Sequence, residues 1–509
     1  MLKVICQWEE DRRMKLNQSR VFPVIMILIF GIVNIFVPNG AVQATGGFQA
    51  SAEETTQIDK FVETMMDKLQ LPGVAIGIVR GDQPLYLKGY GVTGPQGQPV
   101  TAQTPFILGS STKSFTALAI IQLVEQGKVD LEAPVRDYLP QFEIADREAS
   151  GKILVKHLLN QNSGLSTYTG RLGFAGTEPT IEELIRGFKD TPLSEPVGTT
   201  YQYSNANYDI LGGIVQSVSG MSYADYVRKN IFELLDMKNS FTSTLAAKKH
   251  GLASGYQSIF GYMFPTEQPD NPSMLASAYL ISSAEDMAHY LISQLNDGNF
   301  GDSSVASAES IRRMHEPAVP DPTINGHYGM GWEIADGVVR HQGDIENFHS
   351  SMVLDGDTGI IVLINAHDYL VRGGKFEMIT DGIRDILHGR QPQTDVGSVM
   401  GTHLILDLVC LAVAVLLGIS VVRLFKRKVR IACTPLRNLL FVLFLLLFNF
   451  AIPVVVLYGA GRFVASWRVV CSFLPGLGHL VFLLCILALG IGVVKLILFV
   501  GNLRRVIRI

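Results

Sequence analysis

Hydrophobic residues recur at helical or alternating spacing through most of the chain and predict its elements. In residues 55–69 the apolar side chains fall at helical spacing, and Ser51 with Glu54 forms a capping box in front of them. The stretches GVAIGIV and PLYLKGYGV, separated by RGDQ, are typical of a β-hairpin. Near the other end, HSSMVLDGDTGIIVLINAH predicts a second hairpin that turns at Asp355–Gly359, and GGKFEMITDGIRDILHG predicts a closing helix.

Strands therefore lie at both ends of this region, with mostly helical and loop sequence between about residues 113 and 300. The fold class that we expect is α/β. The two ends build an antiparallel β-sheet flanked by helices, and the long helical insertion forms a second lobe. A cleft between two lobes is a natural ligand site.

Three apolar stretches follow, at roughly Thr402–Val422, Leu439–Tyr458 and Gly476–Val500, and each is long enough to cross a bilayer as a helix. The loop RLFKRKVRIACTPLR and the tail GNLRRVIRI carry most of the flanking basic residues. The positive-inside rule therefore places both in the cytoplasm and residues 45–400 outside.

The first apolar run, Val21–Val37, follows Lys15 and Arg20 and precedes the small residues Val42 and Ala44. It predicts a secretory signal cleaved after Ala44, or alternatively an uncleaved anchor. We expect four parts. They are a signal peptide or N-terminal anchor at 1–44, a folded domain at 45–395, three transmembrane helices at 402–501 and a cytoplasmic tail at 502–509. The protein is then a multi-pass protein of the cell membrane with its folded domain extracytoplasmic.

Composition limits the partners and the catalytic groups that the folded domain can use. The net charge of −4 argues against nucleic acid as a partner. None of the five cysteines lies between residues 7 and 409, so the folded domain has neither a cysteine nucleophile nor thiolate metal ligands. Its histidines lack metal-ligand spacing, and we expect no metal and no cofactor.

A candidate nucleophile lies in ILGSSTKSFTALAIIQLVEQG, which runs from Ile107 to Gly127. If a helix starts at about Ser110, Lys113 lies on the same face and can bring its amine next to the serine hydroxyl. Burial by FTALAIIQL would lower the pKa of Lys113 and let it take the serine proton. Taken alone, Ser-x-x-Lys is a weak signal, and a solvated helix N-cap is the competing interpretation.

Two further motifs strengthen the catalytic interpretation. Tyr203-Ser204-Asn205 is predicted on a loop before a helix and offers a phenol and an amide. His341-Gln342-Gly343 is predicted at the end of a strand.

Together with HLLNQNSGL from His157 and YGMGW from Tyr328, the motifs GSSTKSFTA, YSN and HQG resemble those of the serine β-lactamase-like superfamily. The nearest branch comprises class C β-lactamases, low-molecular-weight penicillin-binding proteins and related esterases and peptidases. The resemblance covers about residues 55–390 and implies a β-lactamase/transpeptidase-like fold for the domain at 45–395.

The resemblance also implies roles. Ser110 matches the acylated nucleophile, Lys113 its general base and proton shuttle, and Tyr203 a partner in the acid–base work. Asn205 matches the amide that binds substrate and Lys113.

The third motif contributes His341, Gly343 and Asp344 to substrate binding. The backbone N–H of Asp344 should complete an oxyanion hole with that of Ser110. His341 stands where many relatives have lysine, and Asn347 where this branch often has glycine. Loss of a permanent cation weakens the case for strong β-lactam hydrolysis more than the case for acylation.

The sequence thus predicts a membrane-anchored serine hydrolase acting through an acyl-enzyme on D-amino-acid peptides, β-lactams or related amides and esters. Its partners would be a small-molecule or peptide substrate and the membrane. The alternative is a sensor of penicillin or cell-wall fragments that is acylated, turns over little and signals through its helices.

Overall fold

The structure is a computed structural model that describes residues 51–176, 180–426 and 434–507, with side chains through residue 503. These residues belong to a compact unit that spans Phe48–Ile509. The predicted signal or anchor at 1–44 lies outside the described residues.

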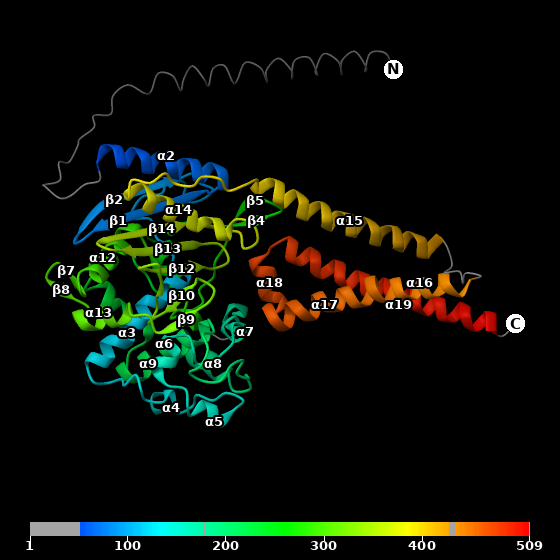
Figure 1. The fold of residues 1–509 in the computed structure, drawn as a ribbon, viewed down its shortest axis with the longest axis horizontal. Coiled ribbons are helices and arrows are strands. Elements are labelled where there is room, and N and C mark those ends of the chain that lie inside the picture. Colours follow the sequence, from blue (N-terminus) through cyan, green and yellow to red (C-terminus); the bar gives the residue numbers. More distant parts are fainter. Residues whose placement is uncertain (1–50, 177–179, 427–433, 508–509) are drawn as a thin grey trace, which may run out of the picture. The chain divides into compact units, whose positions relative to one another are not determined.

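An antiparallel sheet of eight strands organises the domain, in the spatial order β2-β1-β14-β13-β12-β11-β10-β9 (Figure 1). The strands are β1 (Gly73–Arg80), β2 (Gln83–Gly91), β9 (Val319–Asp321), β10 (Gly326–Tyr328), β11 (Glu333–Ala335), β12 (Val338–Asp344), β13 (His349–Asp355) and β14 (Thr358–Ile364). Both predicted hairpins are confirmed, as β1–β2 and β13–β14. The two ends of the domain meet where β1 pairs with β14, with Ile76 opposite Val362.

The sheet is buried on both faces because its central strands are apolar at successive positions. On one face, Ile360 and Val362 join a core with α2 (Ala52–Leu69) and the predicted closing helix α14 (Gly373–Leu387). On the other face, Ile361 and Leu363 join the larger core of α3 (Thr112–Glu125), α9 (Asn205–Ser219) and α12 (Ala284–Leu295). The α2 capping box is also present, since Ser51 Oγ accepts from the Glu54 N–H.

The predicted helical insertion lies between β3 (Phe106–Ile107) and α12. Its short helices are α4 (Val135–Tyr138), α5 (Arg147–Ser150), α6 (Val155–Leu159), α7 (Thr167–Gly170), α8 (Ile181–Arg186), α10 (Tyr223–Val227) and α11 (Thr244–Lys248). Of these, α4, α6, α7, α8 and α10 pack against α9. The remaining elements are α13 (Ala308–Met314) and the short strands β4 (Gly255–Ile259), β5 (Tyr262–Thr266), β6 (Ile281–Ser282), β7 (Asn299–Phe300), β8 (Ser303–Ser304) and β15 (Ala366–His367).

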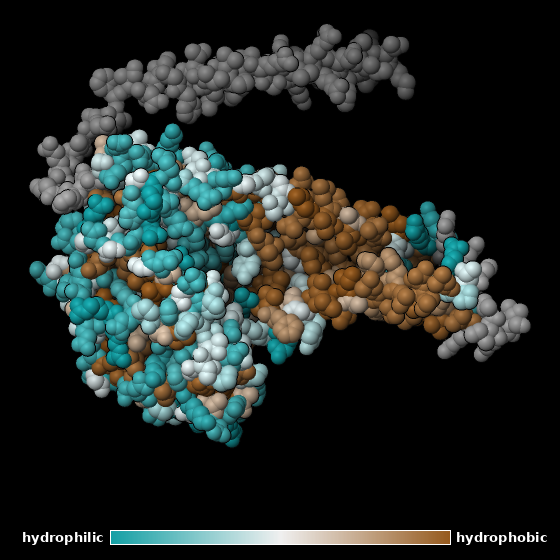
Figure 2. Space-filling view, viewed as in Figure 1, coloured by the Kyte–Doolittle hydropathy of each residue, from teal (hydrophilic) through white to brown (hydrophobic). Residues whose placement is uncertain are grey.

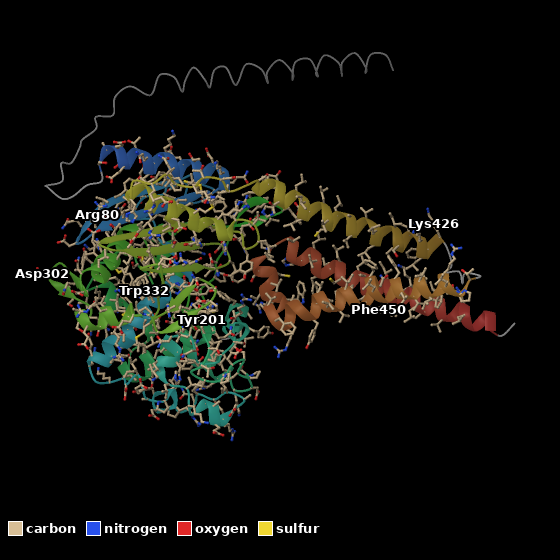
Figure 3. The ribbon with its side chains drawn as sticks, in the orientation of Figure 1. Arg80, Tyr201, Asp302, Trp332, Lys426 and Phe450 are labelled. Atoms are coloured by element: carbon tan, nitrogen blue, oxygen red, sulfur yellow. The ribbon has the colours of Figure 1, made fainter. Side chains whose placement is uncertain are left out.

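Three C-terminal stretches are long and apolar enough to cross a membrane: Val399–Lys426, Pro435–Val464 and Leu477–Leu503. The first is α15 (Val399–Lys426), which ends at the labelled Lys426 in Figure 3. The second joins α16 (Pro435–Leu446) and α17 (Ile452–Gly459) through π-helical turns. After α18 (Trp467–Phe473), α19 (Leu477–Ile507) forms the third. Figure 2 shows that the visible surface of these helices is almost wholly hydrophobic, as a lipid-facing surface requires.

Gly382 on α14 allows α2 to approach closely, because a Cβ there would lie 2.1 Å from the Phe61 ring. Gly382→Ala should therefore destabilise the domain by about 1–3 kcal/mol through overpacking and lower its melting temperature. Gly374→Ala is the matched control, since a Cβ at that position meets nothing within 4 Å. Thermal unfolding monitored by tryptophan fluorescence measures both melting temperatures. Equal values for the two variants would contradict this account of the α2–α14 contact.

Candidate active site

Ser110 lies on a tight turn between β3 and α3. The α-helix begins at Thr112 rather than at about Ser110, because the 3₁₀ turn Gly109–Ser111 precedes it. Gly109 has a φ of 54°, and a Cβ there would lie 2.6 Å from the Asp344 backbone nitrogen. The close approach of β12 therefore requires glycine. Residues i and i+3 nearly eclipse each other in a 3₁₀ turn, so Lys113 still lies beside Ser110.

The amine of Lys113 is fully buried and makes three polar contacts. Its Nζ lies 2.9 Å from Ser110 Oγ, 2.7 Å from Asn205 Oδ1 and 2.8 Å from the carbonyl oxygen of Ser277. Burial lowers the pKa of Lys113 to about 7, although the charge of Asp209 opposes the shift.

These contacts fix the direction of the lone pair of Lys113. The amide oxygen of Asn205 and the carbonyl oxygen of Ser277 can only accept hydrogen bonds, so they take the two N–H donors of a neutral amine. Of the three partners, only the Ser110 hydroxyl can also donate. The lone pair of the neutral amine therefore faces Ser110.

Tyr203 approaches Ser110 from the loop before α9, and its hydroxyl donates to Ser110 Oγ at 2.7 Å. Burial raises the pKa of Tyr203 far above its ordinary value, only partly offset by the hydrogen bond to Ser110. The phenol is therefore neutral and able to donate. Lys113 Nζ lies 4.8 Å from the centre of its ring, so the two groups flank the same oxygen.

Strand β12 brings the third motif against the Ser110 turn, at the strand end that the sequence predicts. A Cβ on Gly343 would lie 1.9 Å from the Leu108 carbonyl oxygen and 2.8 Å from the Ser110 nitrogen, so no side chain fits there. The backbones of Ser110 and of Gly343–Asp344 thus meet closely enough for an oxyanion hole built from two N–H groups.

His341 lies on the same strand but is only 2% exposed. Its Nδ1 donates to the Gln342 carbonyl oxygen at 2.6 Å, which leaves Nε2 to accept from the Tyr328 hydroxyl at 3.1 Å. Burial, reinforced by the charge of Lys113, lowers the pKa of His341 to about 3. The imidazole is therefore neutral, and its influence on a substrate would pass through Tyr328.

Sequence reasoning missed three contributors. Asp209 lies one helical turn after Asn205, and burial raises its pKa, against the hydrogen bond to Ser277 and the charge of Lys113. The i, i+4 spacing of Asn205 and Asp209 was the available signal. The Ser277 carbonyl has no signature in the sequence. Tyr328 begins the YGMGW motif, which entered the sequence analysis only through the family resemblance and was given no role there. Asn347 is buried, and its amide donates to the Thr266 carbonyl oxygen at 3.1 Å, so in this arrangement its amide group engages β5.

Comparisons with known proteins bear on the family and the fold of this chain. Protein flp of Staphylococcus aureus (strain N315) is 30% identical over 323 residues, covering 62% of this chain and 64% of the relative. The chain thus spans less than two thirds of that relative's length.

Among solved structures, the octameric penicillin-binding protein homologue from Pyrococcus abyssi superposes with a TM-score of 0.58 at 26% identity, covering 66% of this chain and 78% of that one. FmtA from Staphylococcus aureus superposes with a TM-score of 0.56 at 21% identity, covering 69% and 93%, and so shares the fold. The family model described as Beta-lactamase matches residues 58–370. With its antiparallel sheet, its flanking helices and this match over more than half its length, the chain belongs to the β-lactamase family.

Proposed function

We propose that this protein is a membrane-anchored, extracytoplasmic serine hydrolase that acts through an acyl-enzyme. Its substrates would be D-amino-acid peptides, β-lactams or related amides and esters. The observation that carries the proposal is the buried Lys113 amine. Among its three hydrogen-bond partners in the described part of the chain, only Ser110 can donate a proton.

Acylation follows from these contacts. Neutral Lys113 accepts the Ser110 proton across the 2.9 Å contact while Ser110 Oγ forms a bond to the acyl carbon. The negative charge on the former carbonyl oxygen is held by the backbone N–H groups of Ser110 and Asp344. The carbon–nitrogen or carbon–oxygen bond then breaks, and Tyr203 delivers a proton to the leaving group and regains one from Lys113.

Deacylation reverses the proton path. Water in the position of the departed leaving group gives a proton to the Tyr203–Lys113 pair and bonds to the acyl carbon. The ester bond to Ser110 breaks, and Ser110 Oγ recovers its proton from the same pair. No other base is needed, because both groups already lie within 2.9 Å of Ser110 Oγ.

The environment of His341 favours substrates that carry no carboxylate, such as simple esters and amides. It disfavours β-lactams, which carry one. A neutral, buried imidazole provides no cation for a substrate carboxylate, and its Nε2 is engaged with Tyr328.

The membrane part of the proposal rests on the three apolar helices and on the distribution of charge. Arg423 and Lys426 at the end of α15 and Arg437 at the start of α16 favour a cytoplasmic loop there. That orientation places residues 45–400 outside the cell.

A second function, favoured by the presence of three spans where one would anchor a domain, is a sensor that is acylated and signals through its helices. Repeated turnover of a short-chain ester would favour the enzyme. A lasting adduct on Ser110 without turnover would favour the sensor.

Ser110→Ala should abolish labelling by a fluorescent fluorophosphonate, because no other hydroxyl has both Lys113 and Tyr203 within 3 Å among the contacts described. Lys113→Ala should slow labelling by about 10²–10⁴-fold. Ser217→Ala, which removes an exposed hydroxyl on α9, is the matched control and should label as wild type. Gel fluorescence measures all three, and equal labelling of wild type and Ser110→Ala would overturn the proposal.

The rate of acylation should rise with pH through an apparent pKa near 7. Below that pH, Lys113 is protonated and lacks the lone pair that takes the Ser110 proton; above it, the amine is neutral. Second-order rate constants of labelling between pH 5.5 and 8.5 test this. A rate that stays flat over this range would contradict the role of Lys113 as the base.

Topology can be tested with single cysteines in a background that has all five native cysteines replaced by serine. Leu245→Cys, which exposes a thiol on α11, should react with a membrane-impermeant maleimide on intact cells. Arg437→Cys should react only after the cells are lysed. The reverse pattern would refute an extracytoplasmic domain.

A further inference from the structure

The β12–β13 pair presents a second polar cluster on the face turned away from Ser110. Side chains alternate across a sheet, so Ser350 faces the nucleophile turn, where its hydroxyl donates to the Leu108 carbonyl oxygen. Its neighbours His349 and Ser351 face α14 instead, where Ser351 Oγ donates to Glu377 Oε2 at 2.9 Å. The carboxylate of Asp344 lies on this α14 face too, although its backbone N–H belongs to the proposed oxyanion hole.

His349 lies between two carboxylates and is 1% exposed. Its Nδ1 is 2.7 Å from Asp344 Oδ1 on β12, and its Nε2 is 3.1 Å from Glu377 Oε1 on α14. A neutral imidazole has one N–H and one bare lone pair, and the lone pair would then face a carboxylate. Carboxylates beside both nitrogens therefore favour a ring that carries two protons, although Nε2 and Glu377 Oε1 lie in contact without the geometry of a hydrogen bond. Burial lowers the pKa of His349, but Asp344 and Glu377 together raise it to about 9.

Asp344 lies at the end of the strand ladder. Its pairing with His349 is the last between β12 and β13, and the turn 345–348 that follows is closed by the Ile345 N–H, which donates to the Phe348 carbonyl oxygen at 3.2 Å. The donor of an oxyanion hole acts through its position, so a small displacement of this strand end costs much of its effect.

We propose that His349, held as an imidazolium between Asp344 and Glu377, fastens the end of β12 to α14 and so positions the Asp344 N–H for the oxyanion. This inference rests on the proposed function. His349 is a positioning residue, since it acts through Asp344 and touches no reacting atom.

The titratable neighbours of His349 come from three elements: Asp344 from β12, Glu377 from α14 and His367 from β15. The Nε2 of His367 lies 3.5 Å from Asp344 Oδ1, and burial lowers the pKa of His367, so this ring is neutral at the pH of interest. Tyr203 titrates far higher. Of these groups, His349 alone changes charge near pH 9. Its charge is present below that pH and is lost as the pH rises through it.

The test is the decline of the acylation rate at alkaline pH, the alkaline limb of the pH profile. The rate of labelling by the fluorophosphonate is measured on the full chain in lipid nanodiscs between pH 7 and 10.5. Wild type should lose activity above about pH 9. Glu377→Gln preserves shape but removes one carboxylate, and it should move this limb down by about one pH unit. His349→Gln should lower the labelling rate by about 10–100-fold, which is a smaller loss than the ~10²–10³-fold that follows removal of a whole oxyanion donor. The rate of this variant should no longer fall at alkaline pH. His349→Lys should restore part of the rate.

His388→Gln is the matched control, because His388 pairs with Asp355 at 2.9 Å and links the opposite ends of β13 and α14. It should leave both rate and profile unchanged. If wild type is labelled but Glu377→Gln keeps the wild-type profile, or if His388→Gln shifts it equally, the positioning role of His349 is wrong while the proposed function stands. If wild type is not labelled at Ser110 at any pH, the proposed function itself fails, and this inference fails with it.

Discussion

The Lys113 amine is placed where water cannot solvate its charge, and the rest of the site depends on that placement. A buried ammonium is costly, so the group loses its proton near neutral pH instead of near its usual ~10.4. The charge of Asp209 offsets this cost only in part, and burial raises the pKa of that carboxyl as well. A neutral amine is what a serine nucleophile needs.

The fold supplies this environment through the two cores of its sheet. The larger core surrounds α3, on which Lys113 sits among buried side chains on every side of the helix. The same core holds α9, which brings Asn205 and Asp209 to the amine. The nucleophile turn then meets the edge of β12, where Gly109 and Gly343 leave room for backbone to touch backbone. Three segments distant in the chain therefore converge on one hydroxyl.

The two faces of β12 have different roles, one toward the reacting atoms and one toward α14. His341 and Gly343 face the reacting side, where a neutral imidazole and a missing side chain leave the backbone donors to stabilise charge. Asp344 carries its carboxylate to the opposite face, toward His349 and α14. The polarity of each face follows from the alternation of side chains along the strand. One short strand end thus links the chemistry of the site to the smaller core.

The sequence by itself determined the elements whose cause is local. Periodic apolar residues and a capping box predicted α2, the two hairpins and α14, and long apolar runs predicted the three spans. Motif spacing brought out Ser110, Lys113, Tyr203 and the third motif, and their resemblance to a family supplied the topology. Only the tertiary structure decided what depends on segments far apart in the chain. These are the Ser277 carbonyl and Asp209 beside the amine, the engagement of His341 with Tyr328, and the pairing of His349 with two carboxylates. A carbonyl has no sequence signature, and burial of a titratable group is a property of packing rather than of its neighbours in the chain.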